Sequence, residues 1–215
     1  MKFRYSLVVF DLDGTLVDSA SDIAEAVNRM LADWSLPRVD EAVIRGWIGD
    51  GVKALVQAAL DHARSTLTLE QVMPGFMVHY EACLLLDPQV YPGVREALET
   101  LRMQGVPTAI CTNKPARFVR PLLEHLSLDG YFDCVVGGDS LPQRKPQPEP
   151  LLHVVQHYCL HPAQCLMVGD SATDLHTAQA AAMPAALVTY GYLRGFDPHS
   201  AAGVEVVDDL RELLG

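Results

Sequence analysis

Short, continuous apolar runs recur along the chain and predict the strands of a buried sheet. The run YSLVVF (5–10) is rich in β-branched and aromatic residues. This composition is typical of a strand that is covered on both faces, as in a parallel sheet. Four later runs have the same character: VPTAICT (106–112), FDCVVGG (132–138), QCLMVG (164–169) and PAALVTY (184–190).

Segments with apolar residues at helical spacing separate these runs. The expected helices are GVREALETLRMQG (93–105), PARFVRPLLEHLSL (115–128), PEPLLHVVQHYCL (148–160) and ATDLHTAQAAAM (172–183). Strand and helix therefore alternate from about residue 90 onward. This alternation predicts an α/β fold with a doubly wound parallel sheet.

Residues 18–87 interrupt the alternation with four helical patterns and no convincing strand. A segment that contains proline and glycine, LLLDPQVYPGV (84–94), then leads back to the alternating part. The chain passes between the alternating part and this helical segment near residues 16–19 and 84–92, and these two places are the expected hinges. We predict two domains, an α/β core of residues 1–17 and 88–215 and an inserted helical cap of residues 18–87.

The overall charge excludes two classes of partner. The chain has 215 residues, of which 49% are hydrophobic, enough for a sizeable core. Its 27 acidic and 16 basic side chains give a formal net charge of −11. An acidic surface repels nucleic acid and anionic membranes, so we expect neither partner. An anionic small substrate is still compatible, because a bound cation can invert the field of one cleft.

The cysteines and the N-terminal segment indicate a cytoplasmic protein. The five cysteines are odd in number and show no CxxC spacing, which favours reduced thiols over a disulfide framework. MKFRYSLVVF enters a strand-like run without the pattern of a signal peptide, and no apolar run is long enough to span a bilayer. We expect a monomer or a homodimer.

Polar residues follow the predicted strands, at the edge where an open α/β sheet binds its ligands. Carboxylates two residues apart after the first strand repel each other and raise each other's pKa, so a bound cation is expected beside them. Lys114 is expected to be an ordinary surface lysine. The candidate site residues at these strand ends are Asp11, Asp13, Thr112, Asn113, Lys145, Asp170 and Asp174.

The acidic candidates fit a magnesium site. Asp11, Asp170 and Asp174 offer the hard oxygen ligands that Mg²⁺ prefers. The metal would neutralise these carboxylates and a substrate phosphate together.

The remaining candidates fit phosphoryl transfer. Thr112 and Asn113 can donate hydrogen bonds to phosphate oxygens, and Lys145 adds a cation suited to phosphate. Asp11 could attack phosphorus and form an aspartyl-phosphate. Asp13 could protonate the leaving oxygen and later deprotonate the attacking water.

Four motifs, DLDGT, CTNK, KP and GDSATD, occur in this order across nearly the whole chain. Together they resemble the haloacid dehalogenase superfamily of phosphatases. The resemblance implies Asp11 as the nucleophile and Asp13 as acid and base, and also as a metal ligand through its backbone carbonyl. It implies Asp170 as a metal ligand, with Thr112 and Lys145 stabilising the phosphate.

The resemblance extends to Asp174 and to the insertion. Asp174 matches the final acidic position of the last motif, which supports the metal or Lys145. The superfamily implies a Rossmann-like core, and the helical insertion matches a cap of the type placed between the first two motifs. Asp13 separates the chain from the dehalogenases themselves, which lack a second aspartate.

A narrower resemblance concerns the substrate. DLDGTLVDSASDIAEAVN, RGWIGDGVKALVQAAL and LVTYGY resemble bacterial phosphoglycolate phosphatases, which implies Mg²⁺-dependent hydrolysis of 2-phosphoglycolate. The cap loop of those enzymes usually reads W-I-G-N-G. Here Gly49, Asp50 and Gly51 stand at its end as candidate substrate-binding residues. The aspartate adds a negative charge near the expected entrance, which Arg45 and Lys53 could compensate.

Three alternatives stay open. A phosphatase for another small metabolite, such as a sugar phosphate or pyrophosphate, would use the same motifs. A phosphoglucomutase-like transferase would return the phosphoryl group to a sugar, but GWIGDG lacks the arginine that a mutase cap loop usually carries. A signalling receiver also combines an acidic cluster with Thr or Ser and Lys, but Asp13 and the helical insertion argue against it.

Overall fold

A six-stranded parallel sheet forms the centre of the structure, a computed structural model that describes residues 3–214. The strand order is β5-β4-β1-β6-β7-β8, and every pairing is parallel. The carboxyl ends of all six strands therefore share one edge. The strands are β1 (Leu7–Phe10), β4 (Thr108–Cys111), β5 (Phe132–Val136), β6 (Cys165–Gly169), β7 (Ala185–Val188) and β8 (Glu205–Val207).

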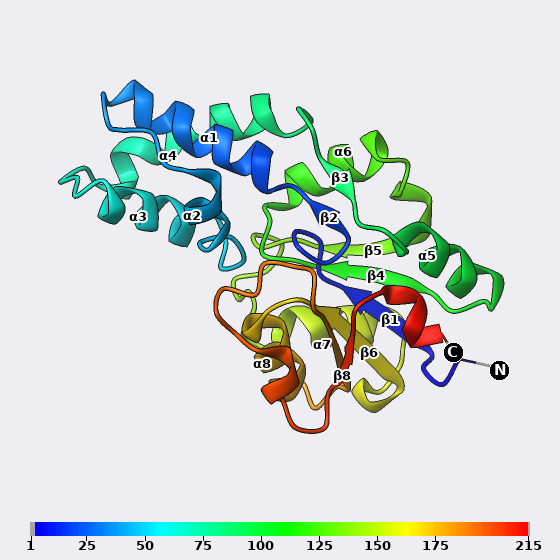
Figure 1. The fold of residues 1–215 in the computed structure, drawn as a ribbon. Coiled ribbons are helices and arrows are strands. Elements are labelled where there is room, and N and C mark those ends of the chain that lie inside the picture. Colours follow the sequence, from blue (N-terminus) through cyan, green and yellow to red (C-terminus); the bar gives the residue numbers. More distant parts are fainter. Residues whose placement is uncertain (1–2, 215) are drawn as a thin grey trace.

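Both faces of this sheet are apolar and covered by helices (Figure 1). Val8 and Phe10 of β1 belong to the core beneath α5 and α6, whereas Leu7 and Val9 belong to the core beneath α7 and α8. Residues that alternate along one strand thus serve opposite faces, which confirms the predicted doubly wound sheet. The helices are α5 (Val94–Met103), α6 (Ala116–His125), α7 (Glu149–His157) and α8 (Ala172–Ala180).

Four helices form the insertion that follows β1 and precedes α5, beside the carboxyl edge of the sheet (Figure 1). Its interior is continuous with the core on the α5 and α6 face. One contact across this junction joins Tyr80 on α4 to Phe118 on α6, with ring centroids 4.8 Å apart. The helices are α1 (Ala20–Asp33), α2 (Glu41–Arg45), α3 (Val52–His62) and α4 (Leu69–Cys83).

A two-stranded antiparallel ribbon marks the places where the chain leaves the core and returns to it. β2 (Val17–Asp18) pairs with β3 (Gln89–Val90), so that Val17 lies opposite Val90. The sequence predicts crossings at these places but not the strands, because two residues carry no recognisable period. The division into residues 1–17 with 88–215 and residues 18–87 stays a prediction.

The elements otherwise agree with the sequence pattern. All five predicted strands and all eight predicted helices occur, with shorter bounds. The short edge strand β8 was not predicted. Among the described residues, no helix is sufficiently long and apolar to cross a bilayer. The part of the chain that the structure describes also contains four short 3₁₀ helices: η1 (Asp129–Tyr131), η2 (Pro162–Gln164), η3 (Pro198–Ser200) and η4 (Leu210–Leu214).

Candidate active site

Asp11 is the first residue after β1, the strand that lies between β4 and β6. The first residues after those neighbours are Thr112 and Asp170, so the parallel register brings all three to the same edge of the sheet. All three side chains are buried. The structure thus brings together residues that are about 100 and 160 positions apart in the sequence.

Lys145 reaches this edge from the loop after β5. Its Nζ atom lies 2.9 Å from Oδ1 of Asp11 and 2.6 Å from Oδ1 of Asp174. Burial alone would lower the pKa of Lys145, but the two carboxylates outweigh it and raise the pKa above its ordinary value. Lys145 is therefore a charged ammonium group held directly beside Asp11.

Asp174 is fixed by the start of α8. Its Oδ2 atom accepts hydrogen bonds from the backbone N–H of Ser171 at 3.1 Å and from the Ser171 hydroxyl at 2.6 Å. Ser171 is the N-cap of α8 and Asp174 is its third helical residue, so the two form a capping box. The end of the GDSATD motif therefore starts the helix and orients the carboxylate that holds Lys145.

Three buried carboxylates, those of Asp11, Asp170 and Asp174, form an acidic cluster. Each offers an oxygen, and these oxygens lie within 4.8 Å of one another. Burial raises the pKa of Asp11 to about 6, although Lys145 counteracts part of this effect. Burial, Asp174 and Asp11 together raise the pKa of Asp170 well above its ordinary value. A cation with oxygen ligands would relieve this repulsion.

The carboxylate of Asp170 is held by two hydrogen-bond donors and lies in close contact with Gly14. Thr15 donates its hydroxyl hydrogen to Oδ1 at 3.1 Å, and the backbone N–H of Tyr192 donates to Oδ2 at 2.5 Å. Gly14 has a φ of +91°, and a Cβ atom there would lie 2.3 Å from Oδ2 of Asp170. The glycine of the DLDGT motif therefore satisfies both a left-handed turn and close contact with this carboxylate.

Asp13 lies in a polar network that the sequence did not predict. Oδ1 of Asp13 accepts hydrogen bonds from Ser19 Oγ at 2.6 Å and from Lys114 Nζ at 3.0 Å. Lys114 also donates to the hydroxyl of Tyr80 on α4, at 2.6 Å. Burial alone would lower the pKa of Lys114, but Asp13 and Tyr80 outweigh it and raise the pKa.

The prediction that Lys114 is a surface lysine is wrong. Its side chain has no exposed area, because helix α4 of the insertion lies over it and supplies Tyr80. Periodicity could not reveal this, since Lys114 lies in the turn between β4 and α6, outside both elements. The only signal in the sequence is its position directly after Thr112 and Asn113.

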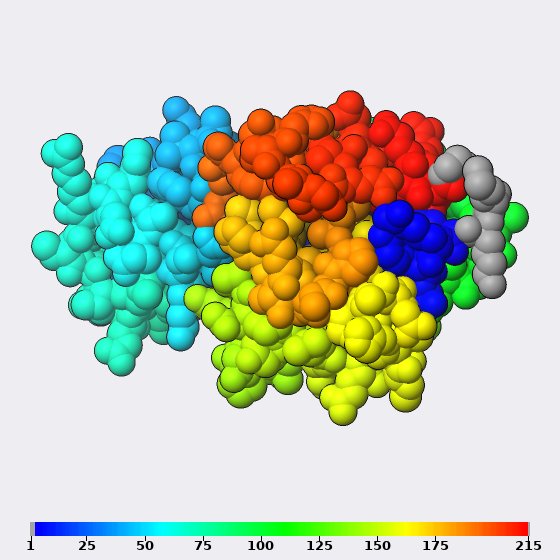
Figure 2. Space-filling model, turned by 90° about the horizontal axis from the view of Figure 1, so that it is seen from below, coloured from blue at the N-terminus to red at the C-terminus, as the bar shows by residue number. Residues whose placement is uncertain are grey.

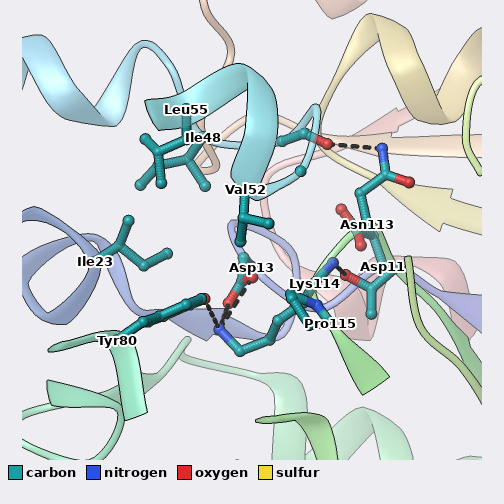
Figure 3. A pocket seen from close by; sticks show the side chains of 13 residues that line it. Asp11, Asp13, Ile23, Ile48, Val52, Leu55, Tyr80, Asn113, Lys114 and Pro115 are labelled. Atoms are coloured by element: carbon teal, nitrogen blue, oxygen red, sulfur yellow. Dashed lines mark hydrogen bonds and ion pairs between the residues drawn. The ribbon is translucent and has the colours of Figure 1, made fainter. Parts of the chain in front are cut away.

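A small cavity opens between these polar residues and the insertion (Figure 3). Its core side presents two carboxylates and the ammonium group of Lys114, and its insertion side is mainly apolar. The cavity is thus suited to a small molecule whose polar groups face the sheet edge. The residues that line it are Asp11, Asp13, Ile23, Ile48, Gly49, Gly51, Val52, Leu55, Tyr80, Thr112, Asn113, Lys114 and Pro115.

Asn113 links the cap loop to the core. Its Nδ2 atom donates to the backbone oxygen of Gly49 at 3.0 Å (Figure 3). It also donates to the backbone oxygen of Lys145 at 3.0 Å. Gly49 and Gly51 have φ values of +127° and +86°, which other residues rarely adopt. The two glycines therefore allow the loop to turn against the cavity that they line.

The carboxylate of Asp50 points to a different part of the core. It accepts a hydrogen bond from the Thr173 hydroxyl at 2.8 Å and pairs with Arg194, which lowers the pKa of Asp50. The expected compensation by Arg45 is wrong, because Arg45 pairs with Asp18 and Glu41. Figure 2 shows the segment around residues 40–50 (light blue) against the segment around residues 190–200 (orange).

The compensation by Lys53 is also wrong, because Arg194 is the partner of Asp50 and Lys53 is exposed on α3. The prediction that Asp50 contacts substrate stays untested. Its contacts to Thr173 and Arg194 instead form a second connection between the cap loop and the core, beside the bond from Asn113 to Gly49.

Residues 8–188 match the family of haloacid dehalogenase-like hydrolases, and this range contains all four motifs and every candidate site residue. The chain belongs to this family. The match confirms the resemblance inferred from the motifs, and the residues brought together at the sheet edge are those that the motifs contribute.

Several similar proteins share the name phosphoglycolate phosphatase. The phosphoglycolate phosphatase of Pseudomonas putida KT2440 is 46% identical over 213 residues, which cover 97% of this chain and 78% of the relative. That of Colwellia psychrerythraea is 39% identical and covers 97% of this chain and 95% of the relative. A crystal structure of a predicted phosphoglycolate phosphatase from Haemophilus somnus has 36% identity and a TM-score of 0.93, covering 98% of this chain and 97% of that one.

Proposed function

We propose that this hydrolase is a Mg²⁺-dependent phosphatase that converts 2-phosphoglycolate to glycolate and phosphate through an aspartyl-phosphate on Asp11. The observation that carries the proposal is the position of Asp11, which lines a small cavity, lies 2.9 Å from Lys145 and belongs to a buried acidic cluster. The relatives named phosphoglycolate phosphatase support the choice of substrate, because their sequences align with nearly the whole chain.

The acidic cluster fits a magnesium ion. Its three carboxylates are hard oxygen donors, they lie within 4.8 Å of one another, and two of them have pKa values raised by burial and mutual repulsion. Asp11, Asp170 and Asp174 would hold the ion, together with the backbone carbonyl of Asp13. When bound, the ion neutralises the carboxylates and draws charge from the phosphate.

The phosphate of the substrate would lie between Asp11 and the residues that end β4. The Thr112 hydroxyl and the backbone N–H of Asn113 can donate to phosphate oxygens, whereas the side-chain amide of Asn113 already donates to Gly49 and Lys145. The ammonium of Lys145 has three donors and can bind a phosphate oxygen while it keeps its contacts to Asp11 and Asp174. Asp174 thereby holds Lys145 at the reacting group.

The reaction has two displacements. A carboxylate oxygen of Asp11 forms a bond to phosphorus as the bond from phosphorus to the ester oxygen breaks, and Asp13 gives its proton to that oxygen. In the second displacement Asp13 takes a proton from water as the water oxygen bonds to phosphorus. The bond between Asp11 and phosphorus breaks, and phosphate leaves.

Phosphate release tests this proposal. The wild type is assayed at neutral pH with Mg²⁺ on 2-phosphoglycolate, glucose phosphates, pyrophosphate and p-nitrophenyl phosphate, and each assay is repeated with EDTA. We expect a preference for 2-phosphoglycolate that is lost with the chelator. Preference for another phosphoester would keep the roles of Asp11 and Asp13 but reject the substrate. No release from any of these compounds would reject the phosphatase itself.

The substitution Asp11→Asn tests the nucleophile, because it keeps the shape of the side chain and removes its charge. We expect turnover to fall by at least about 10⁴-fold. The matched control is Asp133→Asn, which makes the same change at an exposed position of β5. Near-normal turnover of Asp11→Asn, with a normal melting temperature, would exclude Asp11 as the nucleophile.

A further inference from the structure

Lys114 gives the cavity a positive charge that the two displacements do not use. It is the only cationic side chain among the described residues that line the cavity. The side chain is fully buried, and the aliphatic residues Ile23, Ile48 and Val52 line the same cavity from the insertion (Figure 3). Charge interactions are stronger in such surroundings than in water.

The ammonium group of Lys114 can exchange one of its contacts for a ligand oxygen. Its three N–H donors face three oxygens, Oδ1 and Oδ2 of Asp13 at 3.0 and 3.3 Å and the hydroxyl of Tyr80 at 2.6 Å, and the contact to Oδ2 is the longest. The Tyr80 oxygen accepts from Lys114, so its own hydrogen can be donated elsewhere. Lys114 and Tyr80 thus form a pair of donors at the cavity wall, one from the core and one from α4.

The position of this pair relative to Asp13 selects a class of leaving group. In the proposed reaction Asp13 protonates the ester oxygen of the substrate, so that oxygen must lie beside the Asp13 carboxylate. Lys114 Nζ lies 3.0 Å from the same carboxylate. A group one carbon away from the ester oxygen would therefore come within reach of Lys114. In a phosphate ester of a 2-hydroxycarboxylic acid, that group is a carboxylate.

We propose that Lys114, assisted by the Tyr80 hydroxyl, binds the carboxylate of the leaving group and so makes the site specific for phosphate esters of small 2-hydroxycarboxylic acids. This assignment rests on the proposed phosphatase function. Lys114 reads the end of the substrate that carries no phosphate, whereas Lys145 lies at the phosphate end beside Asp11.

A pair of substrates tests the assignment. 2-Phosphoglycolate and ethyl phosphate share the phosphate and a primary ester carbon, and only the first carries a carboxylate. In Lys114→Met, kcat/KM for 2-phosphoglycolate should fall about 10- to 100-fold more than kcat/KM for ethyl phosphate, as expected for the loss of one charge-assisted hydrogen bond. The quantity to compare is the ratio of kcat/KM for 2-phosphoglycolate to kcat/KM for ethyl phosphate. Any effect of Lys114 on Asp13 changes kcat/KM for both substrates alike and cancels in this ratio.

Lys53→Met is the matched control, because it removes the same charge from an exposed position on α3. It should leave the ratio unchanged. If Lys114→Met does not fold, as judged by its melting curve, Tyr80→Phe takes its place, since it keeps the pair of Lys114 with Asp13. That variant should lower the ratio several-fold.

Three results would overturn the assignment. Equal losses for both substrates in Lys114→Met would limit Lys114 to positioning Asp13. A wild type that hydrolyses both substrates with the same kcat/KM would show that the site does not read the carboxylate, while the phosphatase function would stand. A wild type that releases phosphate from neither substrate would remove both the function and the assignment.

Discussion

Asp11 and Asp13 are two residues apart, yet their surroundings prepare them for different roles. Asp11 lies beside Lys145 and within the acidic cluster, where a metal and a phosphate would meet. Asp13 lies beside Ser19 and Lys114, at the wall of the cavity that the insertion covers. The first position suits attack on phosphorus, and the second suits proton transfer to the group that leaves.

This division predicts how Asp13→Asn depends on the leaving group. The variant keeps the side-chain shape but cannot donate the proton, so hydrolysis of 2-phosphoglycolate should fall about 10²- to 10⁴-fold. p-Nitrophenyl phosphate needs little protonation of its leaving oxygen and should lose much less. Initial rates with the two substrates give this comparison. Equal losses on both would contradict an acid role for Asp13.

The raised pKa of Asp11 predicts how stability depends on pH and metal. Its ordinary value is 3.8 and its value in the fold is about 6, so the folded state holds this proton more tightly than the unfolded state. The contribution of Asp11 to stability with EDTA should therefore fall as pH rises from about 4 to about 6, by up to about 3 kcal/mol, and stay lower above that range. Mg²⁺ should restore it mainly above pH 6, where Asp11 is charged.

Melting curves between pH 4 and 8, with EDTA or with Mg²⁺, measure this effect. Asp11→Asn is the control, because it has no charge to lose at this position. With EDTA, the free energy of unfolding of Asp11→Asn should increase relative to that of the wild type as pH rises through the same range. Parallel curves for the two proteins at every pH would show that burial of Asp11 has no such cost.

The acidic and phosphate-binding candidates could be predicted at the residue scale, whereas Ser19, Lys114 and Tyr80 could not. Asp11, Thr112 and Asp170 each follow a strand, so the topology alone brings them together. Tyr80 meets Lys114 only because α4 packs over the sheet edge. No spacing in the sequence expresses that contact between distant segments.

At the scale of elements, the start of α8 combines folding and function. The capping box of Ser171 and Asp174 satisfies N–H groups at the helix start and at the same time orients the carboxylate that holds Lys145. A helix end that is loosened here should therefore disturb both stability and the position of the cation.

Ser171→Ala should lower the free energy of unfolding by about 1 kcal/mol, because it removes an N-cap. It should also lower kcat, since Asp174 loses its hydrogen bond from the Ser171 hydroxyl and holds Lys145 less firmly. Denaturant melts and steady-state kinetics measure the two effects. Ser6→Ala, at an exposed position before β1, is the control and should change neither.

The inner strands β1, β4, β6 and β7 were predictable because burial on both faces makes each of them a nearly continuous apolar run. β2, β3 and β8 were not, because segments of two or three residues contain too little pattern. β8 is also an edge strand, with Glu205 exposed, and so lacks the apolar run of a central strand.

At the scale of the molecule, three sets of contacts hold the insertion against the core around the cavity. Lys114 bonds to Tyr80, Asn113 bonds to the backbone of Gly49, and Asp50 meets Thr173 and Arg194. Substrate must enter between these contacts, so the insertion is expected to open about the ribbon of β2 and β3. The pair of Asp50 and Arg194 is the most exposed of the three.

Arg194→Met should therefore favour the open arrangement. A partly exposed ion pair contributes up to about 1 kcal/mol, so KM should rise about two- to five-fold with kcat nearly unchanged. High salt should raise the KM of the wild type more than that of the variant, because the variant has lost one of the screened charge pairs. Arg211→Met removes an exposed arginine paired with Asp209, away from the insertion, and should leave KM unchanged. An unchanged KM in Arg194→Met would show that the pair of Asp50 and Arg194 does not stabilise the closed arrangement.

The ribbon of β2 and β3 also makes the insertion exchangeable. Because Val17 and Val90 are cross-strand partners, everything between them begins and ends at one point of the core. Recombination could shorten, lengthen or replace this segment without shifting the register of the six-stranded sheet. A replacement segment would need an apolar side chain to cover Phe118, as Tyr80 does in this protein. Exchange of the insertion could thus change the substrate, while the residues at the sheet edge and their chemistry are retained.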